Sequence, residues 1–199
     1  GTSVGGVETL KSEKPLPNEA YPSQLEKEGE EKVTLTFKNG EFTAFNGKEN
    51  TPEINIEKLN NIASAFAIGR DIHVGDTIVG TKGRVGFEAA AASVIIKAHH
   101  LLEKHTLTKW QLQHKEYLAN WYGTHLHEGL FLDPVMRDLE AFLESSQTNV
   151  SGDVFVTLKP YHFTLNGISS ENDLMNSAVG CYGEENKAWT AEDAKGFIK

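Results

Sequence analysis

The chain has 199 residues, of which 39% are hydrophobic, and this size allows one substantial core or two small subdomains. Its 28 acidic residues outnumber its 19 basic residues, and the formal net charge of −9 argues against a nucleic-acid partner. A single cysteine excludes an internal disulfide, and the longest apolar run, residues 89–96, is far too short to span a bilayer. We therefore expect a cytoplasmic protein without a membrane partner.

Residues 1–31 are expected to form an extended, exposed segment, because three prolines interrupt them and a dense run of charges closes them. Residues 32–47 alternate apolar and polar side chains on both sides of Asn39-Gly40. This dipeptide favours a type I′ turn, which needs a positive φ at both central residues, so the stretch predicts a β-hairpin. Apolar residues at helical spacing then predict a helix over residues 54–68, with Gly69 as its C-cap.

Residues 69–88 form a glycine-rich stretch that also carries β-branched residues and charges of both signs. Glycine weakens a core strand, and a flexible linker would not contain so many β-branched residues. We therefore expect extended chain that bends at its glycines and displays its charges. A helix is predicted to follow over residues 87–105, and a basic segment that leads into a helix N-terminus is suited to binding an anion. A plain strand–turn–helix junction with solvated charges explains the pattern equally well.

Two further helices are predicted over residues 108–127 and 134–147. The second begins with aspartate and proline at the N-cap and first helical positions. The first carries aromatic side chains at steps of three and four, which are interpreted as core or subunit interface in preference to a cofactor site. This aromatic stripe consists of Trp110, His114, Tyr117 and Trp121.

Residues 152–169 alternate on both sides of a Lys-Pro turn and predict a second hairpin. Near the end of the chain, Thr190 and Asp193 occupy the capping positions of a short helix. Antiparallel hairpins that are separated along the chain from a group of three to four helices are typical of an α+β fold, not of a doubly wound parallel sheet.

The sequence offers binding residues but no evident catalytic group. His99 and His100 are adjacent, and His125 and His127 are two residues apart, so each pair diverges on its helix and no metal site is expected. Cys181 has no evident histidine partner, which argues against a catalytic thiol. The sequence also has neither a P-loop nor a dinucleotide-binding fingerprint.

Residues 69–88 resemble the corresponding stretch of the argininosuccinate synthase family, and the two align without a gap. The family pattern in this stretch is G-R-x-x-x-V-E-N-x-x-x-G-x-K-S-R-G-x-Y-E. The matching positions are Gly69, Arg70, Val74, Gly80, Lys82, Arg84 and Glu88. The resemblance continues through LLEKHTLTKW and SSQTNVSGDVFVTL to the ending AEDAKGFIK, and it therefore covers nearly the whole chain.

This resemblance implies an ATP-dependent ligase of arginine biosynthesis, which joins citrulline and aspartate into argininosuccinate through a citrullyl-adenylate. Members carry an N-terminal nucleotide-binding domain with an S-G-G-x-D-T-S loop, which this sequence lacks, and ATP with its Mg is expected to bind mainly there. Residues 1–31 are then the linker from that domain, and residues 32–199 are the synthetase and multimerisation domain of a homotetramer. The isolated chain is expected to be inactive. The alternative is a non-catalytic binding or scaffold relative that kept the fold.

The resemblance also indicates which residues bind substrate. They are Ser3, Gly75, Asp76, Lys82, Arg84, Phe87 and Glu88. Gly75 and Phe87 stand where the family has a citrulline-contacting glutamate and tyrosine, and Gly5 replaces a further glutamate close to Ser3. Either Asp76 takes over the ammonium group of citrulline, or the substrate is an N-acyl-citrulline, which has no ammonium group at that end.

Overall fold

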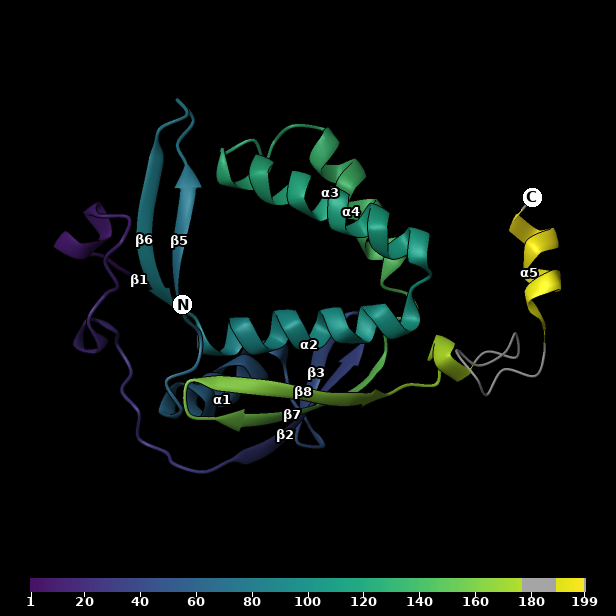
Figure 1. Cartoon of the computed structure of the whole chain (residues 1–199), viewed down its shortest axis with the longest axis horizontal. Helices are drawn as coiled ribbons and strands as arrows, with labels where there is room; N and C mark the ends of the chain where they lie inside the picture. The colour runs from purple at the N-terminus through teal and green to yellow at the C-terminus, as the bar shows by residue number, and fades with distance from the viewer. Residues whose placement is uncertain (177–188, 199) are drawn as a thin grey trace.

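The computed structural model describes residues 1–176 and 189–198. In these residues the chain forms five α-helices and two antiparallel sheets, which confirms the α+β class (Figure 1). Cys181 lies outside the described residues, so the expectation for this thiol stays a prediction. In the described ranges, no helix combines the length and the apolar character that a membrane span requires.

The larger sheet is built from the two predicted hairpins. Its strands follow the order β4-β3-β2-β7-β8. Their bounds are β2 Glu31–Lys38, β3 Glu41–Phe45, β4 Lys48–Glu49, β7 Gly152–Lys159 and β8 His162–Ser169. The turn between β2 and β3 has φ of 50° at Asn39 and 83° at Gly40, as the predicted turn requires. The central pairing of β2 with β7 joins segments far apart in the sequence.

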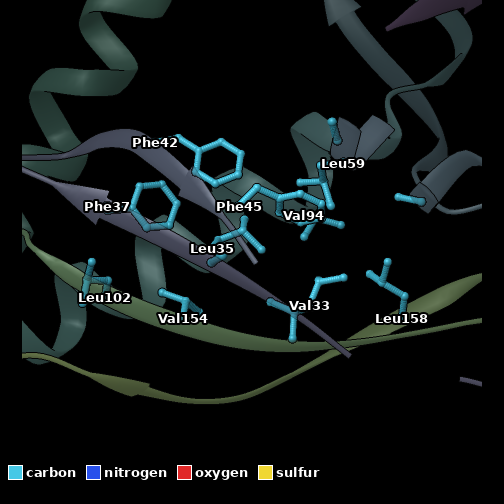
Figure 2. Packing of buried hydrophobic residues seen from close by; sticks show 14 of the residues in the cluster. Val33, Leu35, Phe37, Phe42, Phe45, Leu59, Val94, Leu102, Val154 and Leu158 are labelled. Atoms are coloured by element: carbon cyan, nitrogen blue, oxygen red, sulfur yellow. The ribbon is translucent and has the colours of Figure 1, made fainter. Parts of the chain in front are cut away.

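Two helices cover one face of the larger sheet and enclose the core. These are α1, Pro52–Ala65, and α2, Ala90–Thr106. Figure 2 shows Phe37 and Leu35 of β2 beside Phe42 of β3, with Val94 of α2 facing them. The alternation predicted for β2 and most of the apolar spacing predicted for α1 therefore belong to the core, although Ile54 of α1 is exposed.

The loop between α1 and β5 corrects one prediction. The helix α1 ends at Ala65, Ala67 adopts the positive φ of 53°, and Gly69 is not the C-cap. Gly69 has a different role, because a Cβ on it would lie 2.6 Å from the backbone of Ala89 and Ala90. Gly69 thus lets the chain that leaves α1 cross the start of α2 in direct contact.

The glycine-rich stretch forms a hairpin within the second, three-stranded sheet, which has the order β1-β6-β5. The strands are β1 Thr2–Val4, β5 Arg70–Asp76 and β6 Lys82–Glu88. Residues 1–31 are therefore not wholly extended and free, since β1 pairs with β6 and two short 3₁₀ helices follow, Val7–Leu10 and Asn18–Ala20. A three-residue strand has too little alternation to be visible in the sequence. The domain boundary at residue 31 stays a prediction.

The remaining helices lie on the side of α2 that faces away from the larger sheet (Figure 1). They are α3, Lys109–His127, and α4, Val135–Ser146, which pack against each other. No side chain of α3 is buried, so its aromatic stripe is not part of the core of this chain. The last helix, α5, Ala191–Ile198, has the predicted cap, in which the Thr190 N–H donates to the Asp193 carboxylate at 2.8 Å.

Candidate functional site

The β5–β6 hairpin divides the predicted site residues between its two faces. Directly paired residues in antiparallel strands project to the same face, and successive residues alternate. One face, here called the inner face, is therefore defined by three pairs: Ser3 with Phe87, Asp71 with Phe87, and Gly75 with Gly83. The opposite, outer face carries the other predicted residues, Asp76, Lys82, Arg84 and Glu88.

The inner face borders a cleft between the hairpin and α3, and Figure 1 shows these two elements opposite each other above α2. The cleft has a volume of about 900 Å³ and is lined by residues 73–77 and 83–85 of the hairpin. The lining residues from α3 and its C-terminus are Ala119, Asn120, Gly123, Thr124, His127 and Glu128. Next to the base of the hairpin, a smaller hollow of about 320 Å³ is bordered by Asp71, Phe87 and Lys97. The inner face therefore offers a groove with polar groups on both sides.

His73 is an inner-face residue that sequence reasoning missed. Its Nε2 lies 2.8 Å from the position that a Cβ on Gly75 would take. The imidazole thus occupies the space beside Gly75 at the wall of the cleft. The i, i+2 spacing of His73 and Gly75 in an extended segment was the signal that could have identified it.

Arg84 lies on the outer face and is bound to the N-terminal segment. Its Nη1 donates to the carbonyls of Glu8 at 2.9 Å and Lys11 at 2.8 Å, and its Nη2 donates to the carbonyl of Lys14 at 2.8 Å. A guanidinium that donates along a fixed planar fork is well suited to hold several carbonyls at once. Arg84 therefore holds residues 8–14 against the small sheet.

The two other charged pairs of the outer face differ in burial. Lys82 and Asp76 form an ion pair at 2.5 Å near the tip of the hairpin, with 68% and 59% of their side chains exposed. Glu88 is only 7% exposed, lies 3.5 Å from Arg70 Nε and accepts from the Ser23 N–H at 3.4 Å. Arg70 also donates to the Ser23 carbonyl. The second pair therefore fixes the base of the hairpin.

The predicted anion-binding arrangement is not assembled at the start of α2. Lys82 is six residues before Glu88 on β6, so its Cα lies about 20 Å from the end of the strand that precedes the helix. Arg84 is bound to the N-terminal segment. Within residues 1–176 and 189–198, no three His, Cys, Asp or Glu side chains gather as metal ligands would.

The opposite wall of the cleft is held by a buried carboxylate. Glu103 of α2 is fully buried and accepts from Lys115 Nζ of α3 at 2.9 Å and from Gln147 Nε2 at 2.9 Å. Burial alone would raise the pKa of Glu103, but the hydrogen bond from Lys115 and the nearby His99 outweigh it and lower that pKa below its ordinary value. Burial lowers the pKa of His99. This cluster joins α3 to α2 and thereby fixes the distance across the cleft.

Sequence comparison assigns the family. The family model of the Arginosuccinate synthase C-terminal domain matches residues 8–199 of this chain. The chain belongs to the argininosuccinate synthase family. It is 34% identical to the argininosuccinate synthase of Xanthomonas campestris pv. campestris over 92% of this chain and 44% of that protein. It is 36% identical to the argininosuccinate synthase of Pyrococcus furiosus over 85% of this chain and 41% of that protein.

The chain therefore corresponds to a C-terminal part of an argininosuccinate synthase, and it spans less than half the length of these relatives. In this member of the family, Gly75 lines the cleft, Phe87 borders the smaller hollow, and Ser3 pairs with Phe87 on the same inner face. The register thus assigns Ser3, Gly75 and Phe87 to the inner face and Asp76, Lys82, Arg84 and Glu88 to the outer face, although Asp76 and Arg84 also border the cleft.

Proposed function

We propose that this chain is the citrulline-binding and oligomerisation part of an argininosuccinate synthase. The observation that carries the proposal is the register of the small sheet, which places Ser3, Gly75 and Phe87 on the face that borders the cleft. These are the positions at which the resemblance predicts contacts with citrulline. Membership of the family supports the reaction type.

The reaction has two steps. The ureido oxygen of citrulline attacks the α-phosphorus of ATP, so that an O–P bond forms and pyrophosphate leaves. The amine of aspartate then attacks the ureido carbon of the citrullyl-adenylate, a C–N bond forms, and AMP leaves with loss of a proton from the amine. Argininosuccinate, AMP and pyrophosphate are the products.

The contribution of this chain is to position citrulline, because correct orientation of two reactants is itself a large part of catalysis. No catalytic residue is assigned to it. ATP with its Mg is bound mainly by an N-terminal nucleotide-binding domain, and aspartate reaches the adenylate at the boundary between the two parts. We place the reaction in the cytoplasm.

The α3 stripe supports the oligomerisation role. Trp110, Tyr117 and Trp121 are 61%, 62% and 49% exposed. Large exposed aromatic side chains on one helix are typical of a protein–protein contact. We propose that α3 and α4 contribute to the contact between subunits of a homotetramer.

A non-catalytic relative that kept the fold is the second candidate, and the absence of a carboxylate at Gly75 and of a hydroxyl at Phe87 favours it. An assay of the complete gene product with citrulline, aspartate and ATP separates the two. A ligase turns over, with continuous release of AMP, only when both amino acids are present. Without release of AMP under these conditions, the ligase assignment fails.

The isolated chain provides the complementary measurement. We expect no turnover and no tight ATP binding by residues 1–199, because the resemblance assigns the phosphate-cradling loop to the other domain. Micromolar ATP binding in a calorimetric titration of this chain would contradict that division of roles.

A further inference from the structure

One wall of the cleft is formed by His73 and Gly75, two residues apart on the inner face of β5. Position 75 has no side chain, and the His73 ring lies where one would begin, with Nε2 2.8 Å from the Cβ position of residue 75. This wall therefore presents an imidazole to the cleft. Among the described residues, no hydrogen-bond or ion-pair partner binds the His73 ring.

The carboxylates around this wall are bound to other groups, placed farther along the strand, or on the opposite wall of the cleft. Asp76 also borders the cleft, but it belongs to the outer face and its carboxylate is 2.5 Å from Lys82. Asp71 shares the inner face but is four residues before Gly75, about 13 Å along an extended strand, and it accepts from the Ile72 N–H at 2.7 Å. Glu128 lies across the cleft, beyond the C-terminus of α3. No free carboxylate of the hairpin therefore accompanies His73.

We propose that His73, lying over Gly75, makes the cleft selective for a citrulline whose α-nitrogen is acylated. This inference rests on the proposed function. An imidazole donates an N–H in every protonation state, and it accepts from an ammonium only when it is neutral. An acyl oxygen, or the second carboxylate of a dicarboxylic acyl group, therefore always finds a donor at His73.

Free citrulline is the poorer ligand of this wall. Its ammonium group needs an anionic acceptor, and Asp76 cannot supply one while it is paired with Lys82 on the other face. The cleft of about 900 Å³ also has room for an added acyl group. Acylation leaves the ureido oxygen unchanged, so the two-step ligase reaction proceeds in the same way on the acylated substrate.

The test is a comparison of kcat/KM for citrulline, N-acetyl-citrulline and N-succinyl-citrulline, measured on the complete gene product with fixed aspartate and ATP. We expect at least one acylated substrate to exceed citrulline by about tenfold or more, the effect of one hydrogen bond to a charged or strongly polar group. A preference for N-succinyl- over N-acetyl-citrulline identifies the second carboxylate as the group that His73 binds. Equal rates with both identify the acyl oxygen.

Three variants test the assignment to His73. His73→Ala should lower kcat/KM for the acylated substrate by about tenfold or more and change that for citrulline much less. His73→Asn retains an N–H donor and should recover part of the loss. It also tests the role of the imidazole if the alanine variant folds poorly. The double variant His73→Ala with Gly75→Glu removes the ring and restores a carboxylate, and it should reverse the preference toward citrulline. His105→Ala, near the C-terminal end of α2 and outside the lining of the cleft, is the matched control and should keep the wild-type ratio.

The inference is overturned if the wild type prefers free citrulline, or if His73→Ala leaves the ratio between the substrates unchanged. In both cases the enzyme still releases AMP with citrulline, so the proposed function survives. If none of the three citrulline substrates leads to release of AMP, the proposed function itself has failed.

Discussion

The Arg84 side chain and the Lys14 carbonyl, seventy residues apart in the sequence, are joined by a hydrogen bond of 2.8 Å. Arg84 makes two similar bonds to Glu8 and Lys11, and together they fasten the N-terminal segment to the hairpin that borders the cleft. In the proposed synthase this segment leads to the nucleotide-binding domain. Arg84 is then a positioning residue that sets where the two parts of the active site meet.

Arg84→Ala should therefore release residues 8–14 and reduce activity indirectly. A hydrogen bond involving a charged group contributes about 1.5–3 kcal/mol, and we expect a loss of about 2 kcal/mol because the group is partly exposed. Limited proteolysis should cut between residues 5 and 20 faster than in the wild type. In the complete gene product, kcat/KM should fall by about tenfold or more, or about 1.4 kcal/mol.

Arg84→Lys is the matched variant for that prediction. A lysine keeps the charge but lacks the planar guanidinium, so Arg84→Lys should protect the N-terminal segment from proteolysis only in part. Wild-type proteolysis of Arg84→Ala together with lowered activity would show instead that Arg84 acts directly on substrate. Wild-type values in both measurements would make it an ordinary surface charge.

Gly69→Ala is expected to destabilise the fold strongly. Gly69 has a φ of +87°, and an added Cβ would lie 2.6 Å from the backbone where α2 begins. Backbone strain together with overpacking should lower the free energy of unfolding by about 3 kcal/mol, measured by urea denaturation. Gly80→Ala is the control, because it has a similar φ of +83° but no atom within 4 Å of the added Cβ. Gly80→Ala should lower the free energy of unfolding by only about 1–2 kcal/mol. Equal losses in the two variants would contradict the role of the close contact.

The sequence predicted the elements whose pattern is local. It predicted the Asn39-Gly40 turn, the two hairpins of the larger sheet, the apolar spacing of α1 and the existence of helix α2, each from the residues of one segment. It did not predict the pairing of β1 with β6, because a three-residue strand has almost no alternation and its partner is more than eighty residues away.

The candidate site was predicted as a stretch of chain but not as a surface. The resemblance selected seven positions, and only the register of the hairpin reveals that Gly75 and Asp76, although adjacent, belong to opposite faces. For the same reason His73, which matches no family position, was overlooked. The partners of Glu103 come from α3 and from the end of α4, and no local pattern indicates such a cluster.

The Glu103 cluster should make stability fall in acid in two stages. The pKa of His99 is lowered by burial, so the unfolded chain binds a proton there before the folded chain does, and stability decreases as pH falls below 6.5, the ordinary value. The pKa of Glu103 is also lowered in spite of its burial, so a second loss begins below 4.5. Urea denaturation at a series of pH values measures both stages.

His99→Phe separates the two stages, because it keeps a ring against Phe37 but removes the titrating group. The decrease that begins below pH 6.5 should become smaller in this variant, while the decrease that begins below 4.5 should persist. An unchanged profile in His99→Phe would assign the first stage to other residues.

Trp121→Glu should weaken the association of subunits. Trp121 is half-exposed on α3, in line with Trp110 and Tyr117, and none of the three is needed for the core of this chain. If α3 lies between subunits, a glutamate there places a charge in an apolar contact without a partner, which opposes association. Light scattering should then show a shift of mass toward the monomer, with the helical circular dichroism unchanged.

Leu10→Glu, at a residue 85% exposed in the first 3₁₀ helix, is the control for an added charge elsewhere and should retain the wild-type mass. A wild type that is already monomeric, or a Trp121→Glu variant of unchanged mass, would remove α3 from the subunit contact.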